Sequence, residues 1–170
     1  MIKICKGDIM DRAKVWKFEH NVDTDQIIPS QYLLLPSIDE MKAYAFEPLI
    51  KEFAGQVQAG DVIVAGENFG CGSSREQAPR VLNELGVKAV IAGSFARIFF
   101  RNAINIGLPA IICKEAYDAI QQGDVVELDL AEGTIKIGDQ TLECTKLPPY
   151  MQKILNEGGL IEFLNKEDAK

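Results

Sequence analysis

The sequence lacks the features of a membrane protein and of a nucleic-acid-binding protein. No run of apolar residues approaches the roughly 20 that a transmembrane helix needs, and the opening MIKICKGDIM contains no hydrophobic stretch typical of a signal peptide. Lysine and arginine number 18 against 25 aspartates and glutamates, which gives a formal net charge of −7 without a basic cluster. We therefore expect a cytoplasmic protein that binds neither membranes nor nucleic acid.

Histidine is scarce and cysteine is scattered. His20 is the single histidine, and the 4 cysteines lie far apart without a C-x-x-C pair. Such a chain is poorly equipped to hold zinc, another transition metal or an iron–sulfur cluster by itself, so we expect no metal on it. Cys5, Cys113 and Cys144 are expected to act as small buried residues. Cys71 differs from them because it lies inside a motif.

What is present is the composition of one globular domain with alternating strands and helices. The chain has 170 residues, of which 47% are hydrophobic and 25% charged, and we expect a single domain over residues 1–170. Short β-branched runs predict buried strands, and Ser-led segments ending in glycine predict capped helices between them. The expected strands are 12–18, 61–66, 88–93 and 108–113, and the expected helices are 73–86 and 94–107.

The last third of the chain has a different pattern. Segments 124–130, 133–139 and 140–145 are short and separated by turns, which favours antiparallel strands. Alternation of strand and helix in the earlier part favours a parallel sheet. We expect an α/β fold with a mostly parallel sheet flanked by helices and an added antiparallel β layer.

The segment GENFGCGSSRE, residues 66–76, is the most informative in the chain. Its glycines lie where a strand leads into a helix, a position at which backbone N–H groups can approach an anion. Its spacing matches neither a dinucleotide fingerprint nor a P-loop, and no G-x-S-x-G nucleophile elbow is present. One interpretation is a carboxylate pocket formed by the amides of Gly72, Ser73 and Ser74 and the Arg75 guanidinium.

A simpler interpretation of the same segment is local. Ser73 or Ser74 can cap the following helix, with Glu76 or Gln77 completing a capping box, and spacing alone slightly favours this interpretation. Cys71 is expected to pack rather than to react.

The second candidate segment is NVDTDQIIPSQYLLL, residues 21–35, which we expect to form an ordered loop. Asp23 and Asp25 flank Thr24 and can orient a serine, a water or an arginine, although local backbone capping is favoured for Asp23. Tyr32 is followed by Leu33, Leu34 and Leu35. These leucines belong either to the core or to an apolar binding pocket, and the sequence leaves both open.

Three motifs, NVDTDQIIPSQYLLL, GENFGCGSSREQAP and GSFARIFFRNAINIGLP, together resemble the small subunits of isopropylmalate isomerase. These subunits are homologous to the swivelling last domain of aconitase, and the resemblance runs from about Val15 to the terminal helix. It implies a β/β/α swivelling domain that docks on a separate large subunit in a heteromeric enzyme. It also implies that a [4Fe–4S] cluster is carried by the large subunit and that this chain binds no cofactor.

The resemblance also implies a reaction and roles for residues. Water is lost from 2-isopropylmalate to give 2-isopropylmaleate and returns to give 3-isopropylmalate, a step of leucine biosynthesis. The cluster iron acts as a Lewis acid, and a serine of the small subunit removes the proton from the neighbouring carbon. By position, Ser73 is that base, Arg75 binds a substrate carboxylate, Ser74 is a secondary contact and Asp25 supports the site. Gln77 stands where the family usually has a histidine, which puts a histidine role there in doubt.

Substrate specificity is expected in the loop after Tyr32. Homologues that act on tricarboxylates place an arginine in this loop, whereas here it holds Leu33, Leu34 and Leu35, and no arginine lies between Arg12 and Arg75. An apolar loop suits an isopropyl group, since each buried methylene contributes about 0.8 kcal/mol. We expect 2-isopropylmalate as substrate. The alternatives are 2,3-dimethylmalate, citramalate or homocitrate, and, in a different class, a carboxylate-binding module without chemistry.

Overall fold

The described part of the chain, residues 12–169 of this computed structural model, is built on one sheet of 7 strands in the order β4-β3-β2-β1-β5-β6-β7. The strands are β1 (Arg12–Lys17), β2 (Val62–Ala65), β3 (Ala89–Ala92), β4 (Ala110–Ile112), β5 (Val125–Asp129), β6 (Thr134–Ile137) and β7 (Gln140–Glu143). Strands β1 to β4 are mutually parallel, and β5, β6 and β7 continue from β1 as antiparallel neighbours. The predicted α/β architecture with an antiparallel addition is confirmed.

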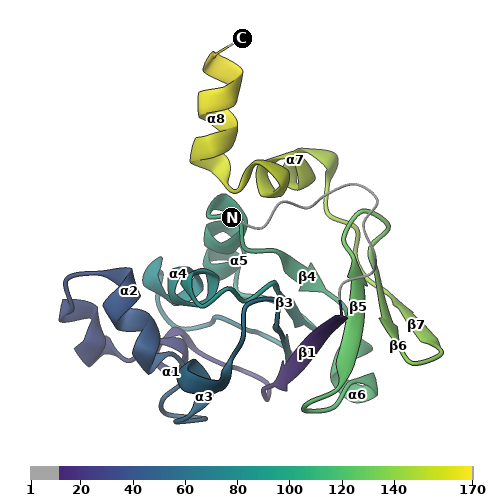
Figure 1. Cartoon of the computed structure of the whole chain (residues 1–170), viewed down its shortest axis with the longest axis horizontal. Helices are drawn as coiled ribbons and strands as arrows, with labels where there is room; N and C mark the ends of the chain where they lie inside the picture. Colours follow the sequence, from purple (N-terminus) through teal and green to yellow (C-terminus); the bar gives the residue numbers. More distant parts are fainter. Residues whose placement is uncertain (1–11, 170) are drawn as a thin grey trace.

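The parallel strands are buried on both faces. Every residue of β2 and of β3 is fully buried, and the register pairs Val62 with Ala89 and Ile63 with Val90. Continuous apolar runs of this kind are expected where a parallel sheet is covered on both sides. The covering layers differ. Most helices pack on one face, whereas the antiparallel strands and the short helix Ala116–Ala119 pack on the other (Figure 1).

The sheet is curled so that its two edges come together. Side chains of β5, β6 and β7, among them Val126 and Ile135, share a hydrophobic cluster with Val62 and Ile91 of the parallel half. Just beyond β7, the N–H of Thr145 donates a 2.8 Å hydrogen bond to a carbonyl oxygen of β4. The antiparallel strands therefore form a layer over one face while remaining part of the same sheet.

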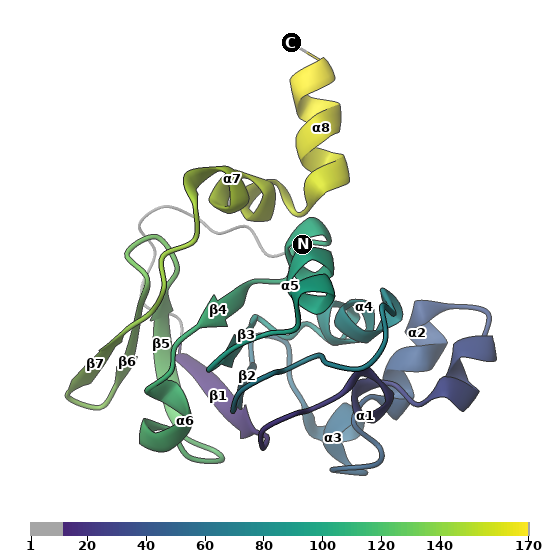
Figure 2. The ribbon, with the colours of Figure 1, turned by 180° about the vertical axis from the view of Figure 1, so that it is seen from behind.

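The helices lie mainly on the other face and at its ends. They are α1 (Thr24–Ile27), α2 (Ile38–Met41), α3 (Phe53–Gln56), α4 (Gln77–Glu84), α5 (Arg97–Asn105), α6 (Ala116–Ala119), α7 (Pro149–Glu157) and α8 (Leu160–Asp168), with 3₁₀ turns η1 (Ser30–Leu34) and η2 (Lys42–Tyr44). Aromatic rings fill the core beneath them, with Phe46 stacked on Phe18 at 4.0 Å and packed edge-on against Phe53. Figure 2 shows α7 beside α5, with α8 extending away from the body.

The predicted strands are confirmed, and Gly86 and Gly107 follow the ends of their helices with positive φ as expected, but the predicted serine N-caps are wrong. Helix α4 begins at Gln77 with Glu76 at its N-cap, and α5 begins at Arg97 with Ala96 at its N-cap, and neither N-cap side chain makes a capping hydrogen bond. Two of the serines that were expected to cap these helices bond elsewhere. Oγ of Ser94 accepts from the N–H of Asn68, and Oγ of Ser73 lies against Oγ1 of Thr24.

The structure also describes the segment 21–35, two of the cysteines and the lengths of the helices. The segment 21–35 is not a plain loop, because it contains α1 and η1. Cys113 is buried and Cys144 is half-buried against the core, while Cys5 and the opening segment lie outside the described residues. None of the helices in residues 12–169 is long and apolar enough to cross a membrane.

Candidate active site

The two motif segments run side by side at the carboxyl ends of β1 and β2. The N–H of Gly70 donates to the carbonyl of Val22 at 2.7 Å, and the N–H of Thr24 donates to the carbonyl of Cys71 at 2.9 Å. Asp23 and Cys71 form a parallel bridge between these hydrogen bonds. In α/β sheets, ligands bind beyond the carboxyl ends of the strands, and both segments lie at these ends.

Glycines make this close approach possible. Gly70 has φ +77°, and a Cβ there would lie 2.2 Å from Cγ of Phe99, so a larger residue collides with the core. Gly72 has φ +96° and turns the chain so that Ser73 faces helix α1. Both backbone conformations are rarely adopted by residues that carry a Cβ.

The hydroxyl groups of Ser73 and Thr24 meet where the segments turn. The N–H of Ser73 donates to Oγ1 of Thr24 at 3.1 Å, and the two hydroxyl oxygens lie 3.0 Å apart. Thr24 is 1% exposed, so its hydroxyl is shielded from water and depends on Ser73 as a partner. Asp23 caps α1 through a capping box with Gln26, which is the local role expected for it. The predicted capping by Ser73 is wrong because its hydroxyl serves this contact instead.

Arg75 lies in an ionic network with α1 and η1. Its guanidinium donates to Oδ1 of Asp25 and, at 3.1 Å, to Oγ of Ser30, which in turn donates to Asp25 at 2.6 Å. Hydrogen bonds from Arg75 and then from Ser30 hold the pKa of the Asp25 carboxyl below its ordinary value. Asp25 therefore stays ionised and fixes the orientation of the guanidinium. These two contacts use two of the five guanidinium N–H donors.

The leucines divide between core and solvent. Tyr32 donates to Glu47 at 2.6 Å and stacks on Tyr44 with ring centroids 3.8 Å apart, which anchors the turn η1. Leu33 and Leu35 pack against the core and are part-buried. Leu34 is 91% exposed at the tip of the turn. The two interpretations left open by the sequence thus apply to different leucines.

Among the described residues of the motif, Ser74, Gln77 and Cys71 form no hydrogen bond to the side chains of Ser73 or Arg75. Ser74 is exposed, and Gln77 is the first residue of α4. Burial and the nearby Asp23 raise the pKa of the Cys71 thiol, and its Sγ donates to the carbonyl of Asn21 at 3.6 Å. A protonated, hydrogen-bonded thiol is a poor nucleophile, which agrees with a packing role.

The single histidine is engaged elsewhere. Nδ1 of His20 accepts from the N–H of Glu67 at 2.9 Å, and its ring packs on Tyr117 at 4.4 Å. Within residues 12–169, no group of three or more His, Cys, Asp or Glu side chains gathers where a metal ion could be held.

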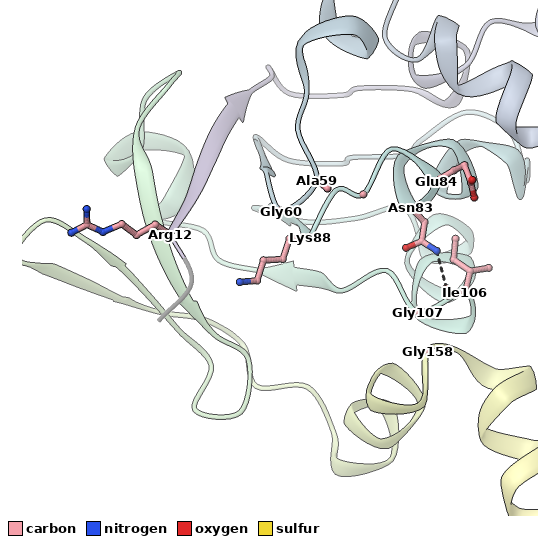
Figure 3. A pocket seen from close by; sticks show the side chains of 10 residues that line it. Arg12, Ala59, Gly60, Asn83, Glu84, Lys88, Ile106, Gly107 and Gly158 are labelled. Atoms are coloured by element: carbon pink, nitrogen blue, oxygen red, sulfur yellow. Dashed lines mark hydrogen bonds between the residues drawn. The ribbon is translucent and has the colours of Figure 1, made fainter. Parts of the chain in front are cut away.

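A cavity of about 730 Å³ lies at the other end of the parallel strands, where they begin. Residues that precede the parallel strands line it, including Gly60 before β2, Lys88 before β3 and Gly107 before β4 (Figure 3). None of its lining residues belongs to the segments 21–35 and 66–76. The cavity is therefore separate from the site formed by Thr24, Ser73 and Arg75.

Sequence reasoning missed two residues of the network, Thr24 and Ser30. Thr24 lies between the two aspartates that drew attention, and its role depends on the parallel pairing with residues 70–72, which the sequence does not reveal. Ser30 is five residues after Asp25, and only the turn between α1 and η1 brings it to Arg75.

Comparison with known proteins relates part of this chain to aconitases and nearly all of it to a solved dehydratase. Residues 47–116 match the aconitase C-terminal domain family. A crystal structure from Methanocaldococcus jannaschii, described as 3-isopropylmalate dehydratase, superposes with a TM-score of 0.88 at 46% identity and covers 93% of this chain and 95% of that chain.

Curated relatives match this chain over nearly its full length. The 3-isopropylmalate dehydratase small subunit of Caldicellulosiruptor bescii is 51% identical over 161 residues, which is 94% of this chain and 97% of the relative. The small subunit 1 of Methanopyrus kandleri is 46% identical over 161 residues, with 94% and 95% covered. This chain belongs to the family of 3-isopropylmalate dehydratase small subunits, as the motifs predicted.

Proposed function

We propose that this chain is the small subunit of a hydro-lyase that interconverts 2-isopropylmalate and 3-isopropylmalate in leucine biosynthesis. The observation that supports this most is the contact between the hydroxyl groups of Ser73 and Thr24. Close to it in the chain, Asp25 and Ser30 orient the guanidinium of Arg75. This arrangement pairs a group that can move a proton with a group that can hold a carboxylate. The family relationship supplies the substrate.

In the proposed reaction, Ser73 Oγ takes the proton from one substrate carbon while hydroxide leaves the neighbouring carbon. The product of this half-reaction is the alkene diacid 2-isopropylmaleate, and water returns with the opposite regiochemistry. A serine oxygen becomes basic enough only where donors stabilise its negative charge in a site closed to water. Thr24 is proposed as one such donor, because its Oγ1 lies 3.0 Å from Ser73 Oγ and its hydroxyl can donate to a deprotonated serine oxygen. The backbone N–H groups of Gly72 and Ser74 are proposed as further contacts to the substrate.

Arg75 is proposed to bind a substrate carboxylate. Its contacts with Asp25 and Ser30 fix the plane of the guanidinium, and the donors they leave can form a bidentate pair with a carboxylate. Asp25 acts as a positioning residue, because it orients Arg75.

The substrate side chain is proposed to lie against the turn η1. Leu34 projects from this turn and is 91% exposed in this chain alone, so it is free to cover an alkyl group when the site closes. Tyr32, Leu33 and Leu35 support the turn from the core side. An apolar contact here favours an isopropyl group and disfavours a third carboxylate, which would be left unpaired.

The partner is proposed to be the large subunit of the dehydratase, which carries the [4Fe–4S] cluster. The described residues of this chain do not supply a ligand set for such a cluster. This chain's share of the reaction is therefore proton transfer and carboxylate binding, carried out in the cytoplasm by one swivelling domain over residues 1–170.

The test is turnover by the anaerobically purified complex with its native large subunit. Substrates are 2-isopropylmalate, 2,3-dimethylmalate, citramalate and homocitrate, and we expect a preference for 2-isopropylmalate. Preference for another alkyl malate would retain the mechanism and change the substrate, whereas preference for homocitrate would contradict the role given to the leucines.

The same complex tests the base. Ser73→Ala is expected to lower turnover by roughly 10²- to 10⁴-fold while the two subunits still assemble. Activity equal to that of the unmodified complex would exclude Ser73 as the base. If the isolated chain bound a malate analogue but no pairing of subunits gave turnover, the protein would be a binding module instead.

A further inference from the structure

The two edges of the curled sheet meet at a pair of cysteines. β4 and β7 are the first and last strands in the sheet order, yet the Thr145 N–H donates to the Ile112 carbonyl at 2.8 Å. Cys113 follows Ile112 and Cys144 precedes Thr145, so each cysteine is next to one end of this hydrogen bond. The two cysteines directly follow the edge strands β4 and β7, whereas the candidate site follows β1 and β2.

The two cysteine side chains lie close together. Sγ of Cys113 donates to the carbonyl oxygen of Glu143 at 3.7 Å, at the residue that precedes Cys144. Cys113 belongs to a hydrophobic cluster against which Cys144 also packs, and each thiol shifts the pKa of the other. Cysteines on neighbouring strand ends can be bridged when their Cα atoms lie within the span of a disulfide.

The pair combines a sheltered sulfur with a reachable one. Cys113 is 2% exposed, whereas Cys144 is half-buried and lines a small surface hollow with Thr134 and Gly133. The hydrogen bond from Cys144 lowers the pKa of Cys113, and the same hydrogen bond together with burial raises the pKa of Cys144. A reagent from solvent therefore reaches Cys144 first because Cys144 is the more exposed, although only the small thiolate fraction of Cys144 can react. Cys113, whose pKa is lowered, is the better nucleophile for the second step.

We propose that Cys113 and Cys144 form a reversible intramolecular disulfide by exchange with a small-molecule disulfide such as oxidised glutathione. In the first step the Cys144 thiolate attacks one glutathione sulfur, which forms a mixed disulfide and releases one glutathione thiolate. In the second step the Cys113 thiolate attacks the Cys144 sulfur and releases the second glutathione. The protein loses two electrons and two protons, and the glutathione disulfide is reduced to two thiols.

This disulfide would covalently close the sheet. It would link β4 to the end of β7 and enclose a loop of about 30 residues, a size for which a bridge constrains the unfolded chain substantially. Because Cys113 already contacts the residue before Cys144, we expect the bridge to form with little rearrangement of the native state. We expect the Tm of the oxidised chain to exceed that of the reduced chain by roughly 5–10 °C.

The experiment oxidises the native full-length chain with oxidised glutathione, blocks the remaining thiols with iodoacetamide and maps the peptides by mass spectrometry. We expect a linked peptide pair containing Cys113 and Cys144, which dithiothreitol separates again. Cys5 and Cys71 serve as internal references within the same sample. Recovery of Cys113 and Cys144 as alkylated thiols, or their bridging only in urea, would overturn the proposal.

Variants resolve the two steps. Cys113→Ser is expected to stop at a glutathione adduct on Cys144, and Cys144→Ser is expected to leave Cys113 unmodified because solvent does not reach it. Cys5→Ser is the matched control, which removes a thiol and should still form the bridge. Should Cys113→Ser fold poorly, Cys144→Ser, at the more exposed position, keeps the assignment testable. A bridge that includes Cys71 or Cys5 would contradict it.

Discussion

Thr24 Oγ1 lies 3.0 Å from Ser73 Oγ and also accepts a hydrogen bond from the N–H of Ser73. Either hydroxyl can donate in the contact between the two oxygens. When Ser73 Oγ carries negative charge it can only accept, so the Thr24 hydroxyl is then expected to donate to it and to stabilise that charge. The burial of Thr24 strengthens that effect because no water competes for its hydroxyl.

The first prediction concerns Thr24→Val, which keeps the shape of the side chain and removes its hydroxyl. We expect kcat of the complex to fall by about 10²-fold with KM little changed, because a donor to a developing oxyanion is lost. Steady-state kinetics with 2-isopropylmalate measures this. Thr24→Ser keeps the hydroxyl and should retain most activity, which distinguishes charge stabilisation from packing. Equal losses in both variants would point to packing instead.

The second prediction concerns Asp25→Asn and Arg75→Lys. Lysine keeps the charge of Arg75 but not its planar pair of donors, so we expect KM to rise by roughly 10- to 100-fold. Asp25→Asn leaves the guanidinium in place but removes the charge that orients it, and a smaller rise is expected. Kinetics at saturating and limiting substrate separate these effects. An unchanged KM in Arg75→Lys would exclude a bidentate contact between Arg75 and the substrate.

The third prediction follows from the lowered pKa of Asp25. A carboxyl group whose pKa is lowered by folding stabilises the folded state above its ordinary value of 3.8, and this contribution is lost as the pH falls through the folded-state pKa. Asp25→Asn should therefore be slightly less stable than the unmodified chain at pH 7. The two Tm values should converge as the pH falls below about 4. Thermal unfolding across this range is the measurement, and a constant difference would contradict the assignment.

The fourth prediction concerns the tip of η1. We expect Leu34→Arg to lower kcat/KM for 2-isopropylmalate by roughly 10- to 100-fold and to improve homocitrate relative to it. The Tm should not change, because Leu34 is 91% exposed. Leu34→Met is the control that keeps an apolar contact. Leu33→Arg should instead lower the Tm, since Leu33 packs on the core. An unchanged substrate preference in Leu34→Arg would show that Leu34 does not determine specificity.

The sequence predicted the strands well because β-branched runs bounded by glycine carry the signal for buried parallel strands locally. Through the motif at 66–76 and the family resemblance it also named Arg75 and Asp25, which the structure brings together, while the roles of the site residues stay predictions. It failed at the helix starts, where Ser73 was assigned a cap that the structure does not form. The contact that replaces the cap joins residues 49 positions apart, and no local pattern reports such a pairing. The closure of the sheet at Cys113 and Cys144 was missed for the same reason.

The last prediction tests what holds the two site segments together. Gly70→Ala places a Cβ 2.2 Å from Phe99 in a backbone conformation with φ +77°, so Phe99 or the loop must move. Gly123 has a similar φ of +83° with nothing within 4 Å, and Gly123→Ala therefore measures the backbone strain alone. We expect Gly123→Ala to cost roughly 1–2 kcal/mol and Gly70→Ala roughly 2–5 kcal/mol. Urea unfolding gives both values.

The two glycine variants should differ more in turnover than in the free energy of unfolding. Gly70 donates to Val22 from the position that aligns the two segments, so displacing it moves Ser73 away from Thr24. Gly70→Ala should therefore lose turnover even at temperatures where the complex remains folded, and Gly123→Ala should keep it. If both variants retained turnover in proportion to their folded fractions, the alignment of the segments would not limit catalysis, and Ser73 would have to reach its working position only on docking with the large subunit.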